Sequence, residues 1–114
     1  MITLENKQLY EVKGLKFWIE HKSDKQSIDE VILEKSYQRP RLGFKIESGE
    51  TWLDLGANIG AFSVWASSLG AQVHAFEPSK RNLIIAKENI ALNNSNVKIH
   101  EKAVLSDDFG NLPF

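Results

Sequence analysis

The sequence predicts an α/β fold built on a parallel β-sheet, because short apolar strands alternate with amphipathic helices over most of its length. Residues 51–55, 72–76 and 97–104 have the apolar and β-branched character of strands. Strands that are joined through helices run parallel, with right-handed crossovers. We therefore expect the three strands to lie side by side in chain order, in a doubly wound, Rossmann-like arrangement.

The two intervening helices are indicated by apolar spacing and by their end residues. In the first helix, one apolar face is formed at i, i+3, i+4 and i+7 by Phe62, Trp65, Ala66 and Leu69. Gly70 is a natural end for it. Ser79 can cap the second helix, which runs to about Leu92 and ends at Asn93 and Asn94. Its expected inward-facing residues are Leu83, Ala86, Ile90 and Ala91.

The N-terminal region predicts a β-hairpin followed by a helix. Residues 9–12 and 15–20 read as strands around Lys13-Gly14, and residues 21–26 read as a loop. The capping-box pattern of Ser27 and Glu30 predicts a helix that starts there and stops near Tyr37. We therefore divide the chain into a hairpin extension, residues 1–26, and a Rossmann-like part, residues 27–114.

The predicted sheet lacks the strands that normally continue beyond its first strand. In a doubly wound sheet the ligand crevice lies beside that strand, where the strand order reverses. Residues 51–55 would then form an uncovered apolar edge, which proteins normally avoid. Two explanations remain open: the chain is the first half of a larger domain, or a partner covers the edge, for example in a homo-oligomer.

Composition limits the classes of partner that the sequence predicts. The chain has 114 residues, 42% of them hydrophobic and 25% charged, and a net charge of −1. These values are ordinary for one small globular domain and do not favour nucleic acid or membrane binding. The start has no signal-peptide pattern, so a cytoplasmic protein is expected. The absence of cysteine excludes disulfides, thiolate metal sites and cysteine nucleophiles.

The sequence between the first strand and its helix predicts a nucleotide site. Asp54, Gly56, Ala57, Asn58 and Gly60 form the pattern D-x-G-x-x-x-G. Glycines at such a turn let a ligand approach the backbone at the start of a helix. Asparagine stands where a dinucleotide fingerprint has its second glycine, which argues against a pyrophosphate. An acid before the turn can pair with an ammonium group. Both differences from the dinucleotide fingerprint, Asn58 and Asp54, therefore favour S-adenosyl-L-methionine.

Glu77-Pro78 ends the second strand, a little over 20 residues after Asp54. An acid at this place commonly accepts hydrogen bonds from the ribose hydroxyls of a nucleotide. Pro78 fixes the direction in which the chain leaves the strand. The alternative is a carboxylate that is merely solvated at a strand end, and the glycine turn upstream favours the ligand role.

These two stretches, residues 52–60 and 73–79, resemble the FkbM-type family of S-adenosylmethionine-dependent methyltransferases. The asparagines at 82, 89 and 93 and the segment 103–107 also match that family. The resemblance implies methyl transfer to a hydroxyl of a small molecule or sugar. It also implies that the methionine part lies on the glycine turn, the ribose at Glu77, and the adenine near Ala103.

The sequence leaves the chemistry beyond cofactor binding undefined. It assigns no general base, and the histidines have no metal-ligand spacing, so no metal site is expected. An NAD-type dinucleotide domain is the enzymatic alternative, against which Asn58 argues. A non-catalytic fold that associates through its open sheet edge is the other alternative.

Overall fold

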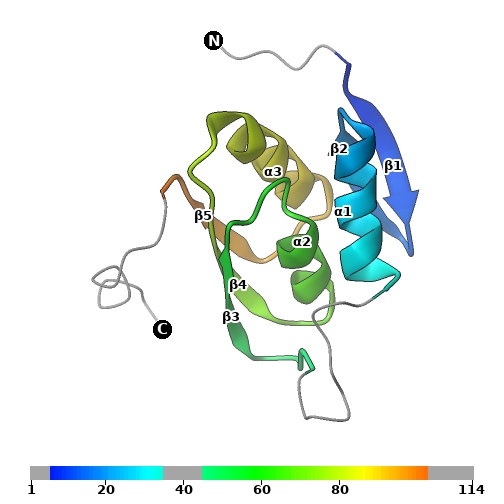
Figure 1. Cartoon of the computed structure of the whole chain (residues 1–114). Coiled ribbons are helices and arrows are strands. Elements are labelled where there is room, and N and C mark those ends of the chain that lie inside the picture. Colours follow the sequence, from blue (N-terminus) through cyan, green and yellow to red (C-terminus); the bar gives the residue numbers. More distant parts are fainter. Residues whose placement is uncertain (1–5, 35–44, 103–114) are drawn as a thin grey trace.

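A computed structural model of the chain describes residues 6–34 and 45–102 (Figure 1). The elements in chain order are β1 (Gln8–Val12), β2 (Leu15–Ile19), α1 (Lys22–Ile32), β3 (Thr51–Leu55), α2 (Ala61–Ser68), β4 (Gln72–Phe76), α3 (Lys80–Leu92) and β5 (Val97–His100).

Strands β3, β4 and β5 form a parallel sheet in that order, as the sequence predicts. The register places Asp54 beside Ala75 and Leu55 beside Phe76, so β3 and β4 end at the same edge. Strand β5 is shorter than expected. It ends at His100, where the N–H group of Lys102 bonds back to the His100 carbonyl at 3.0 Å. Residues 103–104, which were expected to continue it, lie outside the described residues.

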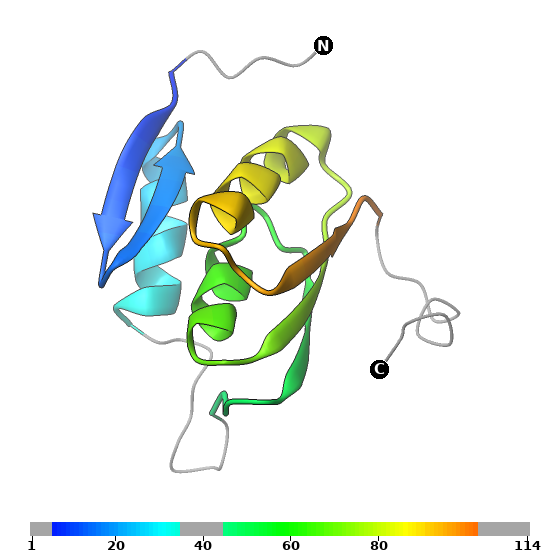
Figure 2. The same cartoon turned by 180° about the vertical axis from the view of Figure 1, so that it is seen from behind.

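Helices α2 and α3 cover one face of the sheet, and the hairpin and α1 pack against these helices from the far side (Figures 1 and 2). Helix α2 is therefore enclosed by the sheet and by α1. Its predicted apolar stripe is only partly correct: Trp65 and Ala66 are buried, but so are Ser63 and Val64, while Leu69 is 37% exposed. A helix packed between two layers is buried on more than one face, which a single stripe cannot describe.

Helix α3 has the bounds that the sequence predicts, and the Ser79 hydroxyl accepts the N–H of Asn82 at its start. Its predicted inward face is partly wrong. Leu83 and Ala86 are buried, but Ala91 is exposed, and Asn89 is fully buried in its place. This asparagine was not expected inside, because an amide is buried only where it finds hydrogen-bond partners.

The start of α1 corrects the sequence prediction. The helix begins at Lys22 rather than at Ser27, within the segment expected to be a loop. Asp24, at the third helical position, accepts the N–H groups of Glu20 and His21 at 2.9 and 3.0 Å. The Ser27 hydroxyl instead donates to the Ser23 carbonyl one turn earlier. The helix ends at Ile32, and Tyr37, where it was expected to stop, lies outside the described residues.

The N-terminal hairpin is confirmed, and its two strands are antiparallel. Lys13 and Gly14 both have positive φ, at 50° and 80°. This is the conformation of the tight two-residue turns that match the twist of a hairpin. Phe17 is fully buried and belongs to the main hydrophobic core together with Ile28 of α1, so the hairpin and the Rossmann-like part share one core.

Candidate functional site

The predicted site residues from Asp54 to Glu77 come together at the carboxyl edge of β3 and β4. The backbone of the glycine turn, residues 56–60, is bonded directly to the end of β4. The N–H groups of Gly56 and Ala57 both donate to the Phe76 carbonyl, at 2.9 and 3.0 Å. The next N–H, that of Asn58, donates to the Glu77 carboxylate at 2.7 Å. Three successive residues of the turn are therefore bonded to the last residue of β4 or to the residue that follows it.

The two glycines of the turn serve different purposes. Gly56 has φ +78°, and a Cβ added there would meet no heavy atom within 4 Å, so it faces open space. Gly60 has φ +92° and caps α2, and a Cβ there would lie 3.5 Å from the Cα of Ala86 in α3. Asn58 also has positive φ, at 52°, which asparagine tolerates better than most residues. Gly56 leaves room for a ligand, and Gly60 lets the turn lie against α3.

Glu77 is buried, with 4% of its surface exposed. Its second carboxylate oxygen accepts the N–H of Ser79 at 2.8 Å, so the carboxylate bridges the glycine turn and the start of α3. Its burial excludes the alternative of a merely solvated acid at a strand end. Each oxygen still has a second lone pair that can accept a hydrogen bond from a ligand. Pro78, which follows it, is exposed.

Asp54 is also buried, and its described hydrogen-bond donors come from one residue of α2, Ser63: the hydroxyl, at 2.7 Å, and the backbone N–H. Burial raises the pKa of Asp54, and the charge of Glu77 raises this pKa further, against the lowering effect of the two Ser63 hydrogen bonds. The ionised form of Asp54 is therefore incompletely compensated by the protein. A cationic ligand group beside it would supply the missing compensation.

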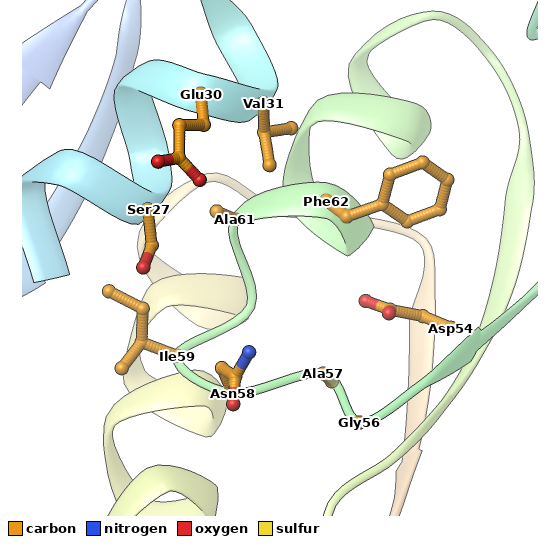
Figure 3. Close-up of a pocket in the computed structure, with 10 residues that line it drawn as sticks. All are labelled: Ser27, Glu30, Val31, Asp54, Gly56, Ala57, Asn58, Ile59, Ala61 and Phe62. Atoms are coloured by element: carbon orange, nitrogen blue, oxygen red, sulfur yellow. The ribbon is translucent and has the colours of Figure 1, made fainter. Parts of the chain in front are cut away.

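Two cavities meet at Asp54. One, of about 170 Å³, lies between the turn and α1, and Ser27, Glu30 and Val31 of α1 form its far wall (Figure 3). The other, of about 250 Å³, is lined by residues of β3 and by the Phe62 ring. Asp54, Gly56 and Phe62 line both. Each cavity alone is below the roughly 300 Å³ of small-molecule sites, so a nucleoside-sized ligand would extend across both.

Sequence reasoning missed the wall that α1 contributes. Ser27 and Glu30 were expected to cap the helix, whereas both lie beyond its first turn and their side chains extend toward the glycine turn (Figure 3). Ser63 was also missed, because it lies beside the apolar residues that define α2 and has no periodic signal of its own. Ala103, expected near the adenine, lies outside the described residues.

The described residues, 6–34 and 45–102, contain no group of three or more histidines or acids that could hold a metal ion. Within the same ranges, every helix is too short or too polar to cross a membrane.

No family model matches the chain. The ribosomal protein L11 methyltransferase of Lactococcus lactis subsp. lactis strain IL1403 is 42% identical to it over 59 residues, 51% of this chain and 19% of that protein. The corresponding protein of subsp. cremoris strain MG1363 is 41% identical over the same length. The chain thus spans about a fifth of the length of the curated relatives that it matches.

Solved structures share the fold. The tRNA (uracil-54, C5)-methyltransferase of Pyrococcus abyssi, in complex with S-adenosyl-L-homocysteine, has a TM-score of 0.63 and 15% identity, over 84% of this chain and 24% of that one. M. jannaschii TYW2, in complex with AdoMet, has a TM-score of 0.62 and 19% identity, over 90% and 46%. The complex of aTrm5 with tRNALeu has a TM-score of 0.60 and 16% identity, over 84% and 28%.

The fold is therefore the Rossmann-like fold of S-adenosylmethionine-dependent methyltransferases. The sequence relatives and the structural neighbours described above are methyltransferases, and two of these structures contain the cofactor or its demethylated product. These findings support the broad class that the sequence indicated, and they do not support the FkbM-type assignment within it. A glycine turn and a strand-end acid are general features of nucleotide sites in Rossmann-like folds, so they could not define the subtype.

The comparisons also correct the expected partners. A small-molecule acceptor and the absence of nucleic acid were predicted, but matched proteins include one named for a ribosomal protein, one named for tRNA and one that is in complex with tRNA. That prediction is wrong. The small-molecule acceptor depended on the FkbM-type resemblance, and the absence of nucleic acid depended on the net charge of −1. A net charge over 114 residues does not report how charge is distributed on the surface of a binding protein.

Proposed function

We propose that this chain is the cofactor-binding part of an S-adenosylmethionine-dependent methyltransferase that modifies a macromolecule, either an RNA or a ribosomal protein. The observation that carries the proposal is the pair of buried carboxylates, Asp54 and Glu77, at adjacent strand ends on either side of an open glycine turn. The macromolecular substrate is suggested by the names of the matched proteins.

In this proposal the turn and its two acids bind different parts of the cofactor. The ammonium group of the methionine part lies near Asp54, whose ionised form lacks compensation. The methionine backbone passes over Gly56, where no side chain intervenes, and along Ala57, Asn58 and Gly60. The free lone pairs of Glu77 accept the ribose hydroxyls, and Pro78 holds the chain beyond it. The adenine end is assigned to the region of Ala103.

The chemistry proposed for the whole enzyme is an in-line substitution at the methyl carbon. A nucleophilic atom of the acceptor forms a bond to this carbon while the carbon–sulfur bond breaks. The electron pair goes to sulfur, which changes from a positively charged sulfonium to a neutral thioether, and the acceptor loses its proton to solvent or to a base. Positioning supplies much of such a rate enhancement, and this chain contributes the position of the sulfonium.

Isothermal titration calorimetry on the full chain tests the cofactor assignment. S-adenosylhomocysteine and S-adenosylmethionine should bind to wild type, and NAD should bind much more weakly. Asn58 at the second glycine position disfavours the pyrophosphate of NAD. Tighter binding of NAD, or no heat with any of the three ligands, would overturn the proposal.

A methyl-transfer assay tests the acceptor class. The whole enzyme, of which this chain is the proposed cofactor-binding part, is incubated with S-adenosylmethionine that is radiolabelled in its methyl group, and with either total tRNA or purified ribosomal proteins. Radioactivity should enter one of these macromolecular fractions. Transfer to a pool of small hydroxyl compounds, with none to either macromolecule, would contradict this part of the proposal while leaving the cofactor assignment intact.

A further inference from the structure

The outer edge of strand β2 is completed by side chains of helix α3 rather than by another strand. The Asn89 side chain accepts the N–H of Trp18 at 2.6 Å and donates to its carbonyl at 3.3 Å. One turn later, Asn93 accepts the N–H of Lys16 at 2.9 Å and donates to its carbonyl at 2.7 Å. Each amide therefore bonds to one residue of β2 as a peptide group of a neighbouring strand would.

Helix geometry explains why two asparagines four residues apart can do this. Four residues of helix rise about 6 Å, and two residues of strand rise about 6.6 Å. Side chains at i and i+4 lie on the same helix face, and Lys16 and Trp18 likewise present their peptide groups on the same edge of β2. An exposed strand edge invites pairing with other chains, and this pair of amides closes it.

Asn89 differs from Asn93 in what else it contacts. Its Nδ2 also donates to the carbonyl of Ile59, in the glycine turn, at 2.8 Å, and the residue is fully buried. The second contact of Asn93 is with the Asn89 carbonyl, in its own helix. Both asparagines thus hold the hairpin, and Asn89 also holds the turn. The turn meets α3 again nearby, where Gly60 lies against Ala86.

We propose that Asn89 is a positioning residue for the cofactor-binding turn, and that it makes the N-terminal hairpin part of the cofactor-binding unit. The proposal rests on the proposed function for the identity of the ligand. Asn89 needs both amide hydrogens and the amide oxygen for its three partners, and no other side chain of this size offers that set. Aspartate would place a negative charge against the Ile59 and Trp18 carbonyls, and alanine would leave buried polar groups without partners.

The test compares Asn89→Ala with the matched control Asn93→Ala. Both variants remove one amide from the edge of β2, and only the first releases Ile59. We measure amide hydrogen exchange by NMR at a temperature where circular dichroism shows both variants folded. The N–H of Asn58, which is bonded to Glu77, should exchange at least about tenfold faster in Asn89→Ala and about as in wild type in Asn93→Ala. Equal acceleration in both, or none in Asn89→Ala, would overturn the proposal.

Titration with S-adenosylhomocysteine gives a second readout. Its dissociation constant should rise about tenfold in Asn89→Ala and less than about twofold in Asn93→Ala. If wild type does not bind this ligand, the proposed function fails, but the exchange experiment still decides the role of Asn89.

If Asn89→Ala does not fold, NMR on the wild-type protein tests the role of Asn89. The side-chain amide protons of Asn89 should exchange slowly in the free protein, and their NMR signals should shift when S-adenosylhomocysteine binds. The Asn93 amide signals, one turn away, should stay within the error of the measurement. Shifts of equal size at both asparagines, or none at Asn89, would contradict a specific connection between Asn89 and the turn.

Discussion

Asp54 and Glu77 end neighbouring strands of one sheet, and both are buried, yet the protein compensates them differently. Glu77 accepts two backbone N–H groups, from Asn58 and Ser79, and so fastens the glycine turn to α3. Asp54 is bonded to the hydroxyl and the backbone N–H of one residue, Ser63, and burial still raises its pKa. The difference indicates that Glu77 stabilises the folded protein before any ligand binds. The ionised form of Asp54, in contrast, lowers the stability of the folded protein until a cationic group binds beside it.

The largest effect should come from removing the Glu77 charge. Glu77→Gln replaces one acceptor oxygen with an NH₂ group that faces a backbone N–H. The free energy of unfolding should fall by about 2–3 kcal/mol, since a buried donor then lacks its acceptor. Binding of S-adenosylhomocysteine should weaken by roughly 100-fold, because the ribose hydroxyls lose a charged acceptor. Chemical denaturation and calorimetry measure the two effects.

Glu88→Gln is the matched control for this variant. Glu88 lies in α3 and forms an ion pair with Lys7 at 3.0 Å, but both side chains are partly exposed. Such a pair contributes about 0–1 kcal/mol, and binding should not change. If Glu77→Gln keeps wild-type stability and loses only binding, Glu77 has no structural task and the contrast with Asp54 disappears.

Asp54→Asn should weaken ligand binding without lowering stability, whereas Glu77→Gln should lower both. The asparagine oxygen can still accept the Ser63 hydroxyl, and the cost of burying a charge is removed. We expect the variant at pH 7 to be at least as stable as wild type. Its affinity for S-adenosylmethionine should nevertheless fall by about 10- to 100-fold, the usual value of a hydrogen bond to a charged group. Thermal unfolding with and without ligand measures both quantities.

A loss of stability in Asp54→Asn without a change in affinity would contradict the assignment of this acid to the ligand. Ser63→Ala serves as a control, because it removes the hydroxyl and keeps the charge. It should lower stability modestly, and affinity should change less than in Asp54→Asn.

Much of this site could be predicted from the sequence, because its signals are local. The turn from Gly56 to Gly60 lies between a strand and a helix within a few residues, and Glu77 follows the next strand directly. Chain order and parallel pairing then bring the two ends to one edge. The same reasoning gave the bounds of β3, β4 and α3, where apolar period and capping residues agree.

The parts that could not be predicted depend on contacts between distant segments. Helix α1 starts at Lys22 because Asp24 accepts two N–H groups and pairs with Arg81, which is 57 residues away. Nothing near Asp24 in the sequence distinguishes it from Ser27 with Glu30, which matches the capping pattern better. Asn89 is a second example, since its burial is explained only by partners in β2 and in the glycine turn.

Asp24 is a third buried acid, and it extends the comparison because its partner is a cation. Burial raises its pKa, but Arg81 and the N–H groups of Glu20 and His21 outweigh burial and hold the pKa below 3.8. Asp24→Asn should lower the free energy of unfolding at pH 7 by about 2 kcal/mol, since a helix cap and a charge-assisted bond are lost.

The pH dependence of this loss follows from the lowered pKa. Stabilisation by Asp24 is fully present above pH 3.8, the ordinary pKa of an aspartate. It disappears as the pH falls through the lower pKa of the folded state. Denaturation of wild type and Asp24→Asn should therefore give converging stabilities in acid. A difference that stays constant down to pH 2 would show that the ionised carboxylate is not what anchors α1. A double-mutant cycle with Arg81→Met measures the pairing itself.

The smallest expected effect is the change with pH in the contribution of Asp54 to the free energy of unfolding. Its sign is opposite to that of the contribution of Asp24. Because folding raises the pKa of Asp54 above 3.8, the folded state favours the protonated form. The contribution of Asp54 to stability is thus fully present below 3.8 and is lost as the pH rises through the folded pKa. Relative to Asp54→Asn, wild type without ligand should become less stable over that window.

Saturating S-adenosylmethionine should reverse this trend. A cation beside Asp54 stabilises the ionised form and lowers its pKa, so wild type gains affinity as the pH rises through the window while Asp54→Asn does not. Denaturation curves for both proteins at several pH values, with and without ligand, measure the change. If the ligand leaves the pH dependence of wild type unaltered, no cationic group binds beside Asp54. The two strand-end carboxylates would then differ in structure alone, and not in function.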